Sequence, residues 1–242
     1  MCMPNVLITG ADRGLGLSLC KEYLQRGYTV FAGKFMADYT LLEDLRAQNE
    51  RLHIIWLDVG ESASIENAVQ MIERTVGTLD AFISNAALMG RTKCDLYDPP
   101  MEVERAWDSF RVNALGPLLL TEKLLPLMEK SPMKRLCYVS SEVACIALMK
   151  YRCDEPFPYP MSKAGMQMGV RMMHNELYER GYMFRLFHPG WMKFRNADGS
   201  LTEIAMYDPD DIGAIAARYF EKDLYDEHRL VMVDFNGYEW PF

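Results

Sequence analysis

The chain has 242 residues, of which half are hydrophobic and a quarter are charged, and its net charge is −8 at pH 7. This length is enough for one α/β domain with a substantial core, and the acidic balance argues against nucleic acid or an anionic membrane as a default partner. No apolar run approaches the ~20 residues of a membrane span, and the first residues lack a basic segment followed by an apolar signal core. We therefore expect a cytoplasmic protein.

The chain opens with a strand, a glycine-rich turn and a helix. Residues 5–9 form a short apolar run, and an apolar face at helical spacing begins at Leu15. Between them, Gly10 permits a tight turn, Gly14 lets backbone approach a pyrophosphate, and Gly16 allows close packing of helix on strand. This pattern predicts a dinucleotide site. The turn residues that we expect to contact the cofactor are Gly10, Asp12, Arg13, Gly14, Leu15 and Gly16.

Strands and helices continue to alternate along the chain. Further strands are predicted at residues 28–32, 53–57, 79–83, 136–140, 185–188 and 230–233, and further helices at 41–45, 62–72, 101–128, 162–178 and 210–220. Ser62 is a candidate helix cap, and Gly116-Pro117 is expected to break the helix around it because proline removes a backbone donor.

This alternation predicts an α/β fold in which residues 1–242 form a single Rossmann-type domain. The sheet should be doubly wound and parallel, with about seven strands and with helices on both faces. Ligands are then expected at the carboxyl ends of the strands.

Tyr159 and Lys163 carry the strongest chemical signal, because residues four apart share one face of a helix. A phenol ionises near pH ~10, so a tyrosine that exchanges protons at neutral pH needs a nearby cation to stabilise its phenolate. Lys163 is placed to supply that cation. An isolated pair of this kind is more often a surface feature, so the interpretation depends on the other motifs.

Several stretches in order resemble the short-chain dehydrogenase/reductase family. Two of these stretches are the turn at Gly10 and the pair Tyr159 and Lys163. The others are residues 84–87 (Ser-Asn-Ala-Ala), Asn113, Ser140-Ser141 after a strand, and Pro189-Gly190 after another strand. The resemblance covers nearly the whole chain. Residues 188–191 also resemble the sniffer-type carbonyl reductases. It implies hydride transfer between NADP(H) or NAD(H) and a carbonyl or alcohol carbon.

The resemblance also implies roles for individual residues. Tyr159 would pass the proton to or from the substrate oxygen, Lys163 would lower the pKa of Tyr159 and bind the nicotinamide ribose, and Ser141 would hydrogen-bond the substrate oxygen. Asn113 would hold a water that relays protons to Lys163. The remaining cofactor contacts implied by the resemblance are Asp58, Val59, Asn85, Ala86, Pro189 and Gly190.

The residue that ends the second strand bears on the choice of cofactor. An acidic side chain there binds the adenosine ribose and repels a 2′-phosphate, whereas this chain has Gly33 followed by Lys34. Arg13 adds a second cation where NADP-preferring members of the family often carry one. We therefore expect NADP(H) to be preferred over NAD(H).

Some features leave alternatives open. The segment 142–158 is longer than in many members and is expected to border the pocket, so either Ser140 or Ser141 can be the functional serine. Ala87 replaces the family glycine, and Phe194 stands where many relatives have a threonine near the nicotinamide. His188 is expected to be a strand-end residue and not an acid or base.

Two other functions remain possible from the sequence. One is a nucleotide-sugar epimerase or dehydratase of the same fold, although few residues follow Pro189-Gly190 to form its substrate region. The other is a regulatory protein that binds NADP without turnover, although such proteins usually lose the tyrosine or lysine.

No metal site is predicted, because the cysteines lack paired metal spacing. We expect them to be reduced thiols, at positions 2, 20, 94, 137, 145 and 153. A homodimer or homotetramer is expected from the apolar content of the helices around 107–128 and 162–178.

Overall fold

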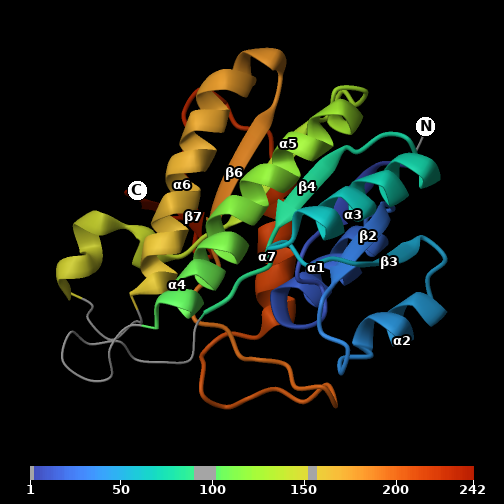
Figure 1. The fold of residues 1–242 in the computed structure, drawn as a ribbon, viewed down its shortest axis with the longest axis horizontal. Helices are drawn as coiled ribbons and strands as arrows, with labels where there is room; N and C mark the ends of the chain where they lie inside the picture. The colour runs from blue at the N-terminus through green and yellow to red at the C-terminus, as the bar shows by residue number, and fades with distance from the viewer. Residues whose placement is uncertain (1–2, 90–101, 152–156) are drawn as a thin grey trace.

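An eight-stranded sheet forms the centre of the computed structural model, which describes residues 3–89, 102–151 and 157–242 (Figure 1). The strands lie in the order β3-β2-β1-β4-β5-β6-β7-β8, and every neighbouring pair is parallel except β7 and β8. Their bounds are β1 Asn5–Ile8, β2 Thr29–Lys34, β3 Leu52–Trp56, β4 Ala81–Ser84, β5 Arg135–Val139, β6 Met183–His188, β7 Met232–Asp234 and β8 Glu239–Trp240. The predicted parallel sheet is confirmed.

The direction of strand order reverses between β1 and β4. From β1 the chain proceeds outward through β2 to β3, and it then returns to place β4 on the other side of β1. A reversal of this kind opens a crevice at the carboxyl ends of the two strands, which is where doubly wound sheets bind their ligands.

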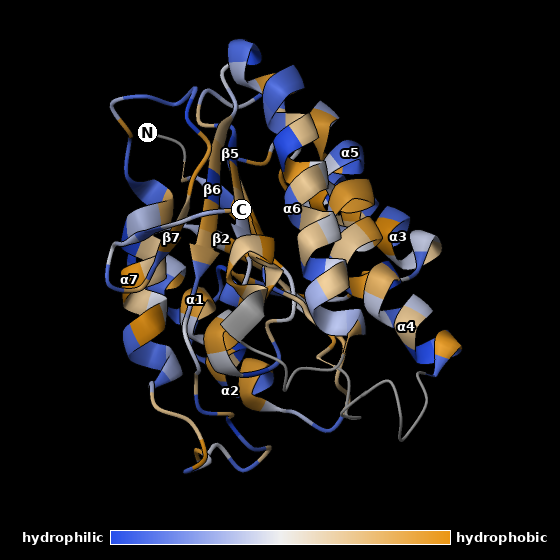
Figure 2. Cartoon of the chain, turned by 90° about the vertical axis from the view of Figure 1, so that its left-hand side faces the viewer, coloured by the Kyte–Doolittle hydropathy of each residue, from blue (hydrophilic) through white to orange (hydrophobic). Residues whose placement is uncertain are grey.

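Helices cover both faces of the sheet. The α-helices are α1 Gly14–Gln25, α2 Leu41–Ala47, α3 Ser62–Thr75, α4 Val103–Phe110, α5 Gly116–Met128, α6 Pro158–Leu177 and α7 Pro209–Glu221. Buried side chains of α3, α5 and α6 form one core with the sheet, while those of α1, α2 and α7 form the other. Figure 2 shows the apolar strands between these two layers. None of the described helices is both long and apolar enough to cross a membrane.

The strands are buried on both faces, as their continuous apolar runs predict. All residues of β1, β2, β4 and β5 are buried. β2 extends two residues beyond the predicted end and includes Lys34, because the pairing with β3 continues to Trp56. The short antiparallel strand β8 was not predicted, since two residues carry no periodic signal.

Two sequence expectations about helix ends are wrong. Ser62 is the first residue of α3 and not its cap; the hydroxyl that anchors the preceding turn belongs to Ser64, which accepts from the Asp58 N–H at 2.9 Å. Gly116-Pro117 also does not break its helix. Residues Arg111–Leu115 form a π-helical turn that leads directly into α5, with Pro117 in the first turn, where its missing N–H is tolerated.

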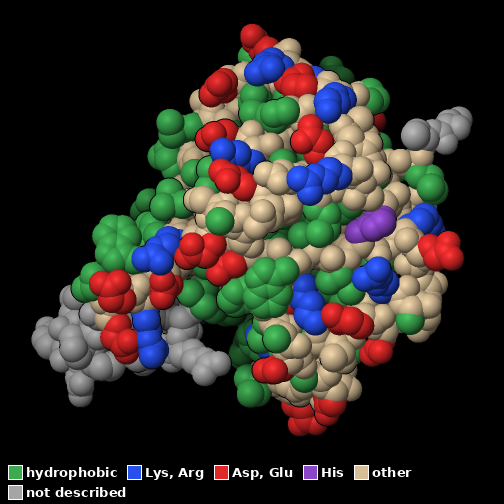
Figure 3. Space-filling view, turned by 45° about the vertical axis from the view of Figure 1, so that its right-hand side comes forward, with side chains coloured by type: hydrophobic (Ala, Val, Ile, Leu, Met, Phe, Trp, Pro, Cys, Tyr) green, Lys and Arg blue, Asp and Glu red, His purple; other side chains and the backbone are tan. Residues whose placement is uncertain are grey.

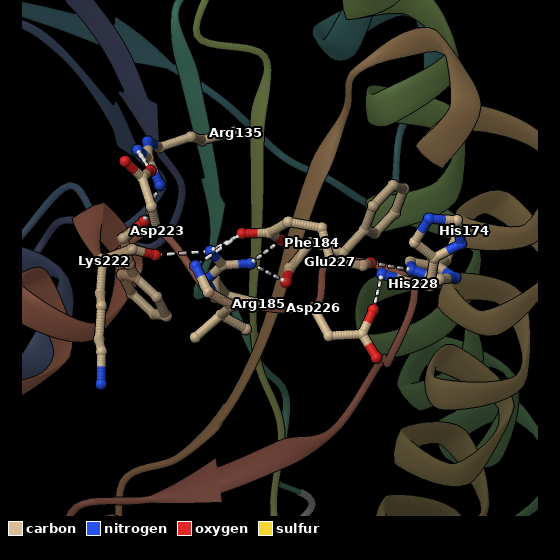
Figure 4. Close-up of polar contacts among 11 residues, drawn as sticks. Arg135, His174, Phe184, Arg185, Lys222, Asp223, Asp226, Glu227 and His228 are labelled. Atoms are coloured by element: carbon tan, nitrogen blue, oxygen red, sulfur yellow. Dashed lines mark hydrogen bonds and ion pairs between the residues drawn. The ribbon is translucent and has the colours of Figure 1, made fainter.

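A buried arginine fastens the segment after α7 to the sheet. Arg185 of β6 has 1% of its side chain exposed, and its two terminal nitrogens each lie 2.7 Å from a carboxylate oxygen of Glu227. The same guanidinium donates to the Lys222 carbonyl at the end of α7, and Arg135 binds Asp223 at 2.6 Å nearby (Figure 4). The Glu227 carboxylate thus neutralises this buried charge, as a structural buried ion pair requires.

Some predicted features lie outside the described residues. These are residue 101 at the expected start of a helix, residues 152–156 of the expected insert, and the cysteines at positions 2, 94 and 153.

Candidate active site

The glycine-rich turn after β1 is closed by contacts that leave no room for larger side chains. Gly10 adopts a left-handed φ of +62°, and a Cβ there would lie 2.7 Å from the Ala86 Cα. A Cβ on Gly16 would lie 2.1 Å from the Gly10 carbonyl oxygen, which is the close packing of helix on strand that the sequence predicted.

Gly14 differs from the other two glycines. Its φ is +54°, but a Cβ there would meet nothing within 4 Å. The constraint at Gly14 is therefore conformational, and the space beside it is open. The side chain of Arg13, the residue before α1, makes no capping hydrogen bond, and the first turn of α1 carries no acidic residue, so we expect its N–H groups and dipole to be available to an anion.

Asn85 holds the ends of β1 and β4 together. Its side-chain amide donates to the carbonyls of Thr9 and Gly10 at 2.9 and 3.0 Å, and the Thr9 hydroxyl accepts from the N–H groups of Asn85 and Ala86 at 3.0 Å. Asn85 thus holds the backbone of the turn, and its expected contact with the cofactor stays a prediction. Thr9 was missed, because a lone threonine at a strand end has no distinctive spacing.

The carboxylate of Asp12 binds backbone. One oxygen accepts from the N–H groups of Phe35 and Met36 at 2.8 and 2.6 Å, which ties the glycine-rich turn to the segment after β2. Asp58 similarly accepts from the Gly60 N–H at 2.8 Å, and Val59 is buried against α5. Both acidic side chains therefore shape the backbone around the crevice.

The two predicted phosphate-binding cations have different partners. The Lys34 ammonium lies 2.7 Å from the Glu43 carboxylate of α2, with 11% of the lysine side chain exposed. Arg13 instead donates to the Tyr39 hydroxyl at 2.7 Å. A Cβ at Gly33 would lie 3.0 Å from the Leu57 side chain and 3.3 Å from the Ile8 carbonyl oxygen, so packing disfavours a carboxylate at this position.

Tyr159 and Lys163 lie one turn apart near the start of α6, as predicted. The Lys163 ammonium donates to the Val139 carbonyl at the end of β5, at 2.9 Å, and 3% of the residue is exposed. Burial lowers the pKa of Lys163 to about 8. Tyr159 is half-buried, and its carbonyl accepts from the Ser162 hydroxyl at 2.9 Å.

Asn113 connects α6 to the loop after β4. Its side-chain oxygen accepts from the Leu88 N–H at 2.7 Å, and its amide nitrogen donates to the Leu88 carbonyl at 2.8 Å and to the Ser162 hydroxyl at 3.0 Å. Both amide N–H groups therefore bind protein. The Asn113 carbonyl lacks an α-helical partner four residues on, because that residue is Pro117.

The two serines after β5 have different surroundings. The Ser140 hydroxyl is buried and accepts from the Gln167 side chain of α6 at 3.0 Å. Ser141 is half-buried at the start of a short 3-10 helix (Glu142–Ala144), and its hydroxyl accepts from the Val143 N–H at 3.4 Å. Ser141 is thus the more exposed of the two serines.

The turn after β6 begins a long loop. Gly190 has a φ of +74°, and a Cβ there would lie 2.7 Å from the Phe235 ring, while Pro189 is buried. His188 accepts from the Glu142 N–H at 3.4 Å and packs edge-on against Trp240 at 5.4 Å. This agrees with the expected strand-end position of His188.

The cysteines that the structure describes are buried and unpaired, at positions 20, 137 and 145. Burial and the nearby Glu142 carboxylate raise the pKa of Cys145 to about 11, so this thiol has little thiolate at neutral pH. Within residues 3–89, 102–151 and 157–242, no group of three or more His, Cys, Asp and Glu residues is arranged to hold a metal.

The sequence profile of the short chain dehydrogenase family matches residues 4–203. The chain belongs to this family. It is an NAD(P)-dependent oxidoreductase, as other members are.

Full-length relatives support this assignment. An oxidoreductase of Schizosaccharomyces pombe is 27% identical over 235 residues, which cover 94% of this chain and 88% of the relative. A second S. pombe oxidoreductase is 30% identical over 79% of this chain and 75% of its own length.

Solved structures of carbonyl reductases share the fold. The Drosophila melanogaster carbonyl reductase Sniffer superposes with a TM-score of 0.86 at 22% identity, covering 100% of both chains. A carbonyl reductase of Pseudomonas aeruginosa, solved in complex with NADP, gives a TM-score of 0.78 at 26% identity, covering 99% of this chain and 100% of the other.

The buried lysine gives this short-chain dehydrogenase a measurable stability cost. A folded-state pKa of about 8, against ~10.4 for a free lysine, costs roughly 3 kcal/mol below pH 8. Between about pH 8 and pH 10.5 the lysine is neutral in the folded state but still protonated in the unfolded state. The stability cost therefore declines as pH rises through this range. Lys163→Met keeps the chain length but removes the charge, and it loses about 1 kcal/mol from the hydrogen bond to Val139.

We therefore expect Lys163→Met to raise the free energy of unfolding of the cofactor-free protein by about 1–3 kcal/mol at pH 7. The gain should shrink towards zero at pH 10. Urea unfolding at both pH values measures it, with Lys123→Met as a control at a partly exposed lysine. A Lys163→Met protein that is less stable than wild type at pH 7 would contradict the prediction.

Proposed function

We propose that this protein is an NADP(H)-dependent carbonyl reductase or alcohol dehydrogenase that uses Tyr159, Lys163, Ser141 and Asn113. The observation that carries the proposal is the buried Lys163 ammonium, one helical turn from Tyr159 and hydrogen-bonded to the end of β5. The buried Lys163 cation lowers the stability of the fold. We infer that it is kept because it has a chemical use near the half-buried Tyr159 phenol.

A dinucleotide is the ligand that we assign to the crevice. The open space beside Gly14 and the uncapped start of α1 suit a pyrophosphate. The hydrogen bonds of Asn85 and Ala86 hold the end of β4 at a fixed distance from the glycine-rich turn. The further residues that we assign to the cofactor are Gly10, Asp12, Arg13, Leu15, Gly16, Lys34, Asp58, Val59, Tyr159, Lys163, Pro189 and Gly190. When bound, the nicotinamide supplies or accepts the hydride.

The side chains of the protein handle the proton. In carbonyl reduction, Tyr159 donates its phenolic proton to the substrate oxygen, and the Lys163 cation stabilises the phenolate that remains. Ser141 donates a hydrogen bond to the same oxygen, where negative charge develops. In alcohol oxidation, the same groups work in reverse.

Asn113 is proposed to act through its backbone. Its side chain is committed to Leu88 and Ser162, so a water that passes protons to Lys163 would bind the Asn113 carbonyl. The π-helical turn and Pro117 support this, because they deprive that carbonyl of its α-helical partner. Asn113 also positions α6 through Ser162, so we expect it to have a structural role as well.

The preference for NADP(H) rests on two cations and one crowded glycine. Lys34 and Arg13 lie at the end of β2 and the start of α1 and can pair with a 2′-phosphate. The packing around Gly33 disfavours the carboxylate that would repel this phosphate.

Replacing Tyr159 by phenylalanine tests the proposed proton donor. The ring and its packing remain, but the proton is lost, so turnover of an accepted aldehyde or ketone should fall by at least ~10²-fold. NADPH affinity should hardly change, whereas Lys163→Ala should reduce both. Tyr178→Phe, at an exposed hydroxyl just beyond the other end of α6, should leave turnover within about twofold of wild type.

Near wild-type turnover by Tyr159→Phe would show that the proton donor has been misassigned. Steady-state rates with a panel of aldehydes, ketones and sugars provide the measurement.

The ion pair of Lys34 with Glu43 tests the cofactor preference. A 2′-phosphate bound to Lys34 lies near the Glu43 carboxylate, so Glu43→Gln should strengthen NADPH binding by about three- to tenfold and leave NADH binding unchanged. Wild type should bind NADPH at least ~10-fold more tightly than NADH. Tryptophan fluorescence titrations measure both affinities.

Asp44→Asn is the matched control, because it makes the same charge change at the next position of α2. It should change neither affinity by more than about twofold. Equal affinity of the wild type for NADPH and NADH would refute the preference.

We also propose that the protein forms a homodimer or homotetramer through α4 and α6. Large apolar side chains are exposed on these helices and on the π-helical turn, namely Val103, Trp107, Leu115, Met161, Met168 and Met172. Figure 3 shows hydrophobic side chains gathered along one side of the molecule. An exposed apolar area of this kind is typical of an interface.

Light scattering tests the assembly. We expect a mass of at least twice the 27.9 kDa of one chain at micromolar concentration, and Trp107→Glu should lower it by placing a charge in the interface. A monomeric mass for the wild type would contradict the proposal.

A further inference from the structure

Two aromatic rings from separate loops lie close to the guanidinium of Arg13. The guanidinium carbon lies 5.1 Å from the centre of the Tyr39 ring and 5.7 Å from that of the Phe194 ring. Tyr39 is buried in the connection between β2 and α2, and 43% of Phe194 is exposed in the loop after β6. The two rings therefore bring the loop after β6 onto the start of α1.

Most N–H groups of the Arg13 guanidinium form no hydrogen bond with a described residue. A guanidinium has five N–H groups in one plane, and cation–π contacts with aromatic rings do not require these groups as hydrogen-bond donors. Among the residues that the structure describes, Tyr39 is the one side chain that accepts a hydrogen bond from Arg13, and no described carboxylate forms an ion pair with it. In a chain of net charge −8, a guanidinium without a carboxylate is suited to an anionic ligand.

We propose that Phe194 and Tyr39 are positioning residues that hold the Arg13 guanidinium for the 2′-phosphate of NADP(H). They would thereby help to determine cofactor specificity, although neither needs to touch the cofactor. This inference rests on the proposed use of NADP(H). It gives Phe194 a role different from that of the threonine expected at this position, because Phe194 acts through Arg13.

The loop holds Phe194 in place without a ligand. The Phe194 N–H donates to the Thr202 hydroxyl, and the Thr202 N–H donates to the Phe194 carbonyl, both at 2.9 Å. These paired bonds close the loop on itself at Phe194. The ring is thus presented to Arg13 by fixed backbone.

The next residue anchors the loop to the rest of the protein. Arg195 donates to the Gly199 carbonyl and to the Asp210 carboxylate, both at 3.1 Å, with 14% of its side chain exposed. Asp210 also accepts from Ser18 and Lys21 of α1. The base of the loop is therefore attached to the same helix whose start carries Arg13.

This arrangement lowers the cost of binding. An exposed arginine loses side-chain freedom when it binds a phosphate, whereas a guanidinium already held by contacts with two rings has less freedom to lose. An aromatic contact of this kind typically changes affinity by a factor of a few. The benefit applies only to a cofactor that has a 2′-phosphate.

Replacing Phe194 by leucine tests the inference, because it keeps apolar bulk but removes the aromatic face. The affinity for NADPH should fall about three- to tenfold, while the affinity for NADH stays within about twofold. Phe194→Trp should restore NADPH binding. Tyr39→Phe, which keeps the ring but removes the hydroxyl acceptor, should weaken NADPH binding selectively.

Two further variants serve as controls. Ile204→Ala changes a 77% exposed side chain of the same loop and should alter neither affinity. Arg13→Gln should abolish most of the difference between NADPH and NADH. The variants should change the affinity for 2′,5′-ADP as they change that for NADPH, and the affinity for 5′-AMP as they change that for NADH. The reason is that the 2′-phosphate is the group that these residues recognise.

The outcomes separate this inference from the proposed function. If wild type binds NADPH and NADH equally, both are overturned. If wild type prefers NADPH and Arg13→Gln removes the preference, but Phe194→Leu leaves it unchanged, the inference alone is overturned. Equal weakening of NADPH and NADH by Phe194→Leu would also overturn it, because a general structural defect cannot select the phosphate.

Discussion

The close approach of β1 and β4 at the switch point is the constraint on which the site depends. Two carbonyls at the end of β1, those of Thr9 and Gly10, are bound by the Asn85 amide, and Gly16 packs directly on the second of them. A side chain on Gly10 or Gly16 would push the helix or the neighbouring strand away. The uncapped start of α1 and the end of β4 are therefore fixed relative to each other before any ligand binds.

Much of the fold could be predicted because local sequence and global packing agree. Buried parallel strands require continuous apolar runs, and α6 shows the apolar spacing that its core side requires at Met166, Val170 and Leu177. The errors arose where tertiary contacts decide. Pro117 was expected to break a helix, but a π-helical turn accommodates it, and β8 exists because Asp234 organises a turn by accepting N–H bonds from Asn236 and Tyr238.

The candidate site, too, could be predicted only in part from the sequence. The relation of Tyr159 to Lys163 follows from helix periodicity alone, so the sequence was sufficient to predict it. The partners of Asp12, Lys34 and Asn113 were not predictable, because each is contributed by another element or loop of the fold. Sequence spacing indicates which residues share an element, but it does not show which hydrogen-bond donors and acceptors are already in use.

The arginines and lysines of this protein show how structural and functional cations differ. Arg185 is buried and bidentate with Glu227, so its charge is matched within the fold. The cations of the site are less completely matched. Lys163 faces a carbonyl, Arg13 faces aromatic rings, and Lys34 has a largely exposed carboxylate that a ligand can displace. We propose that these positive charges, in a protein of net charge −8, serve an anionic ligand that the protein does not itself supply.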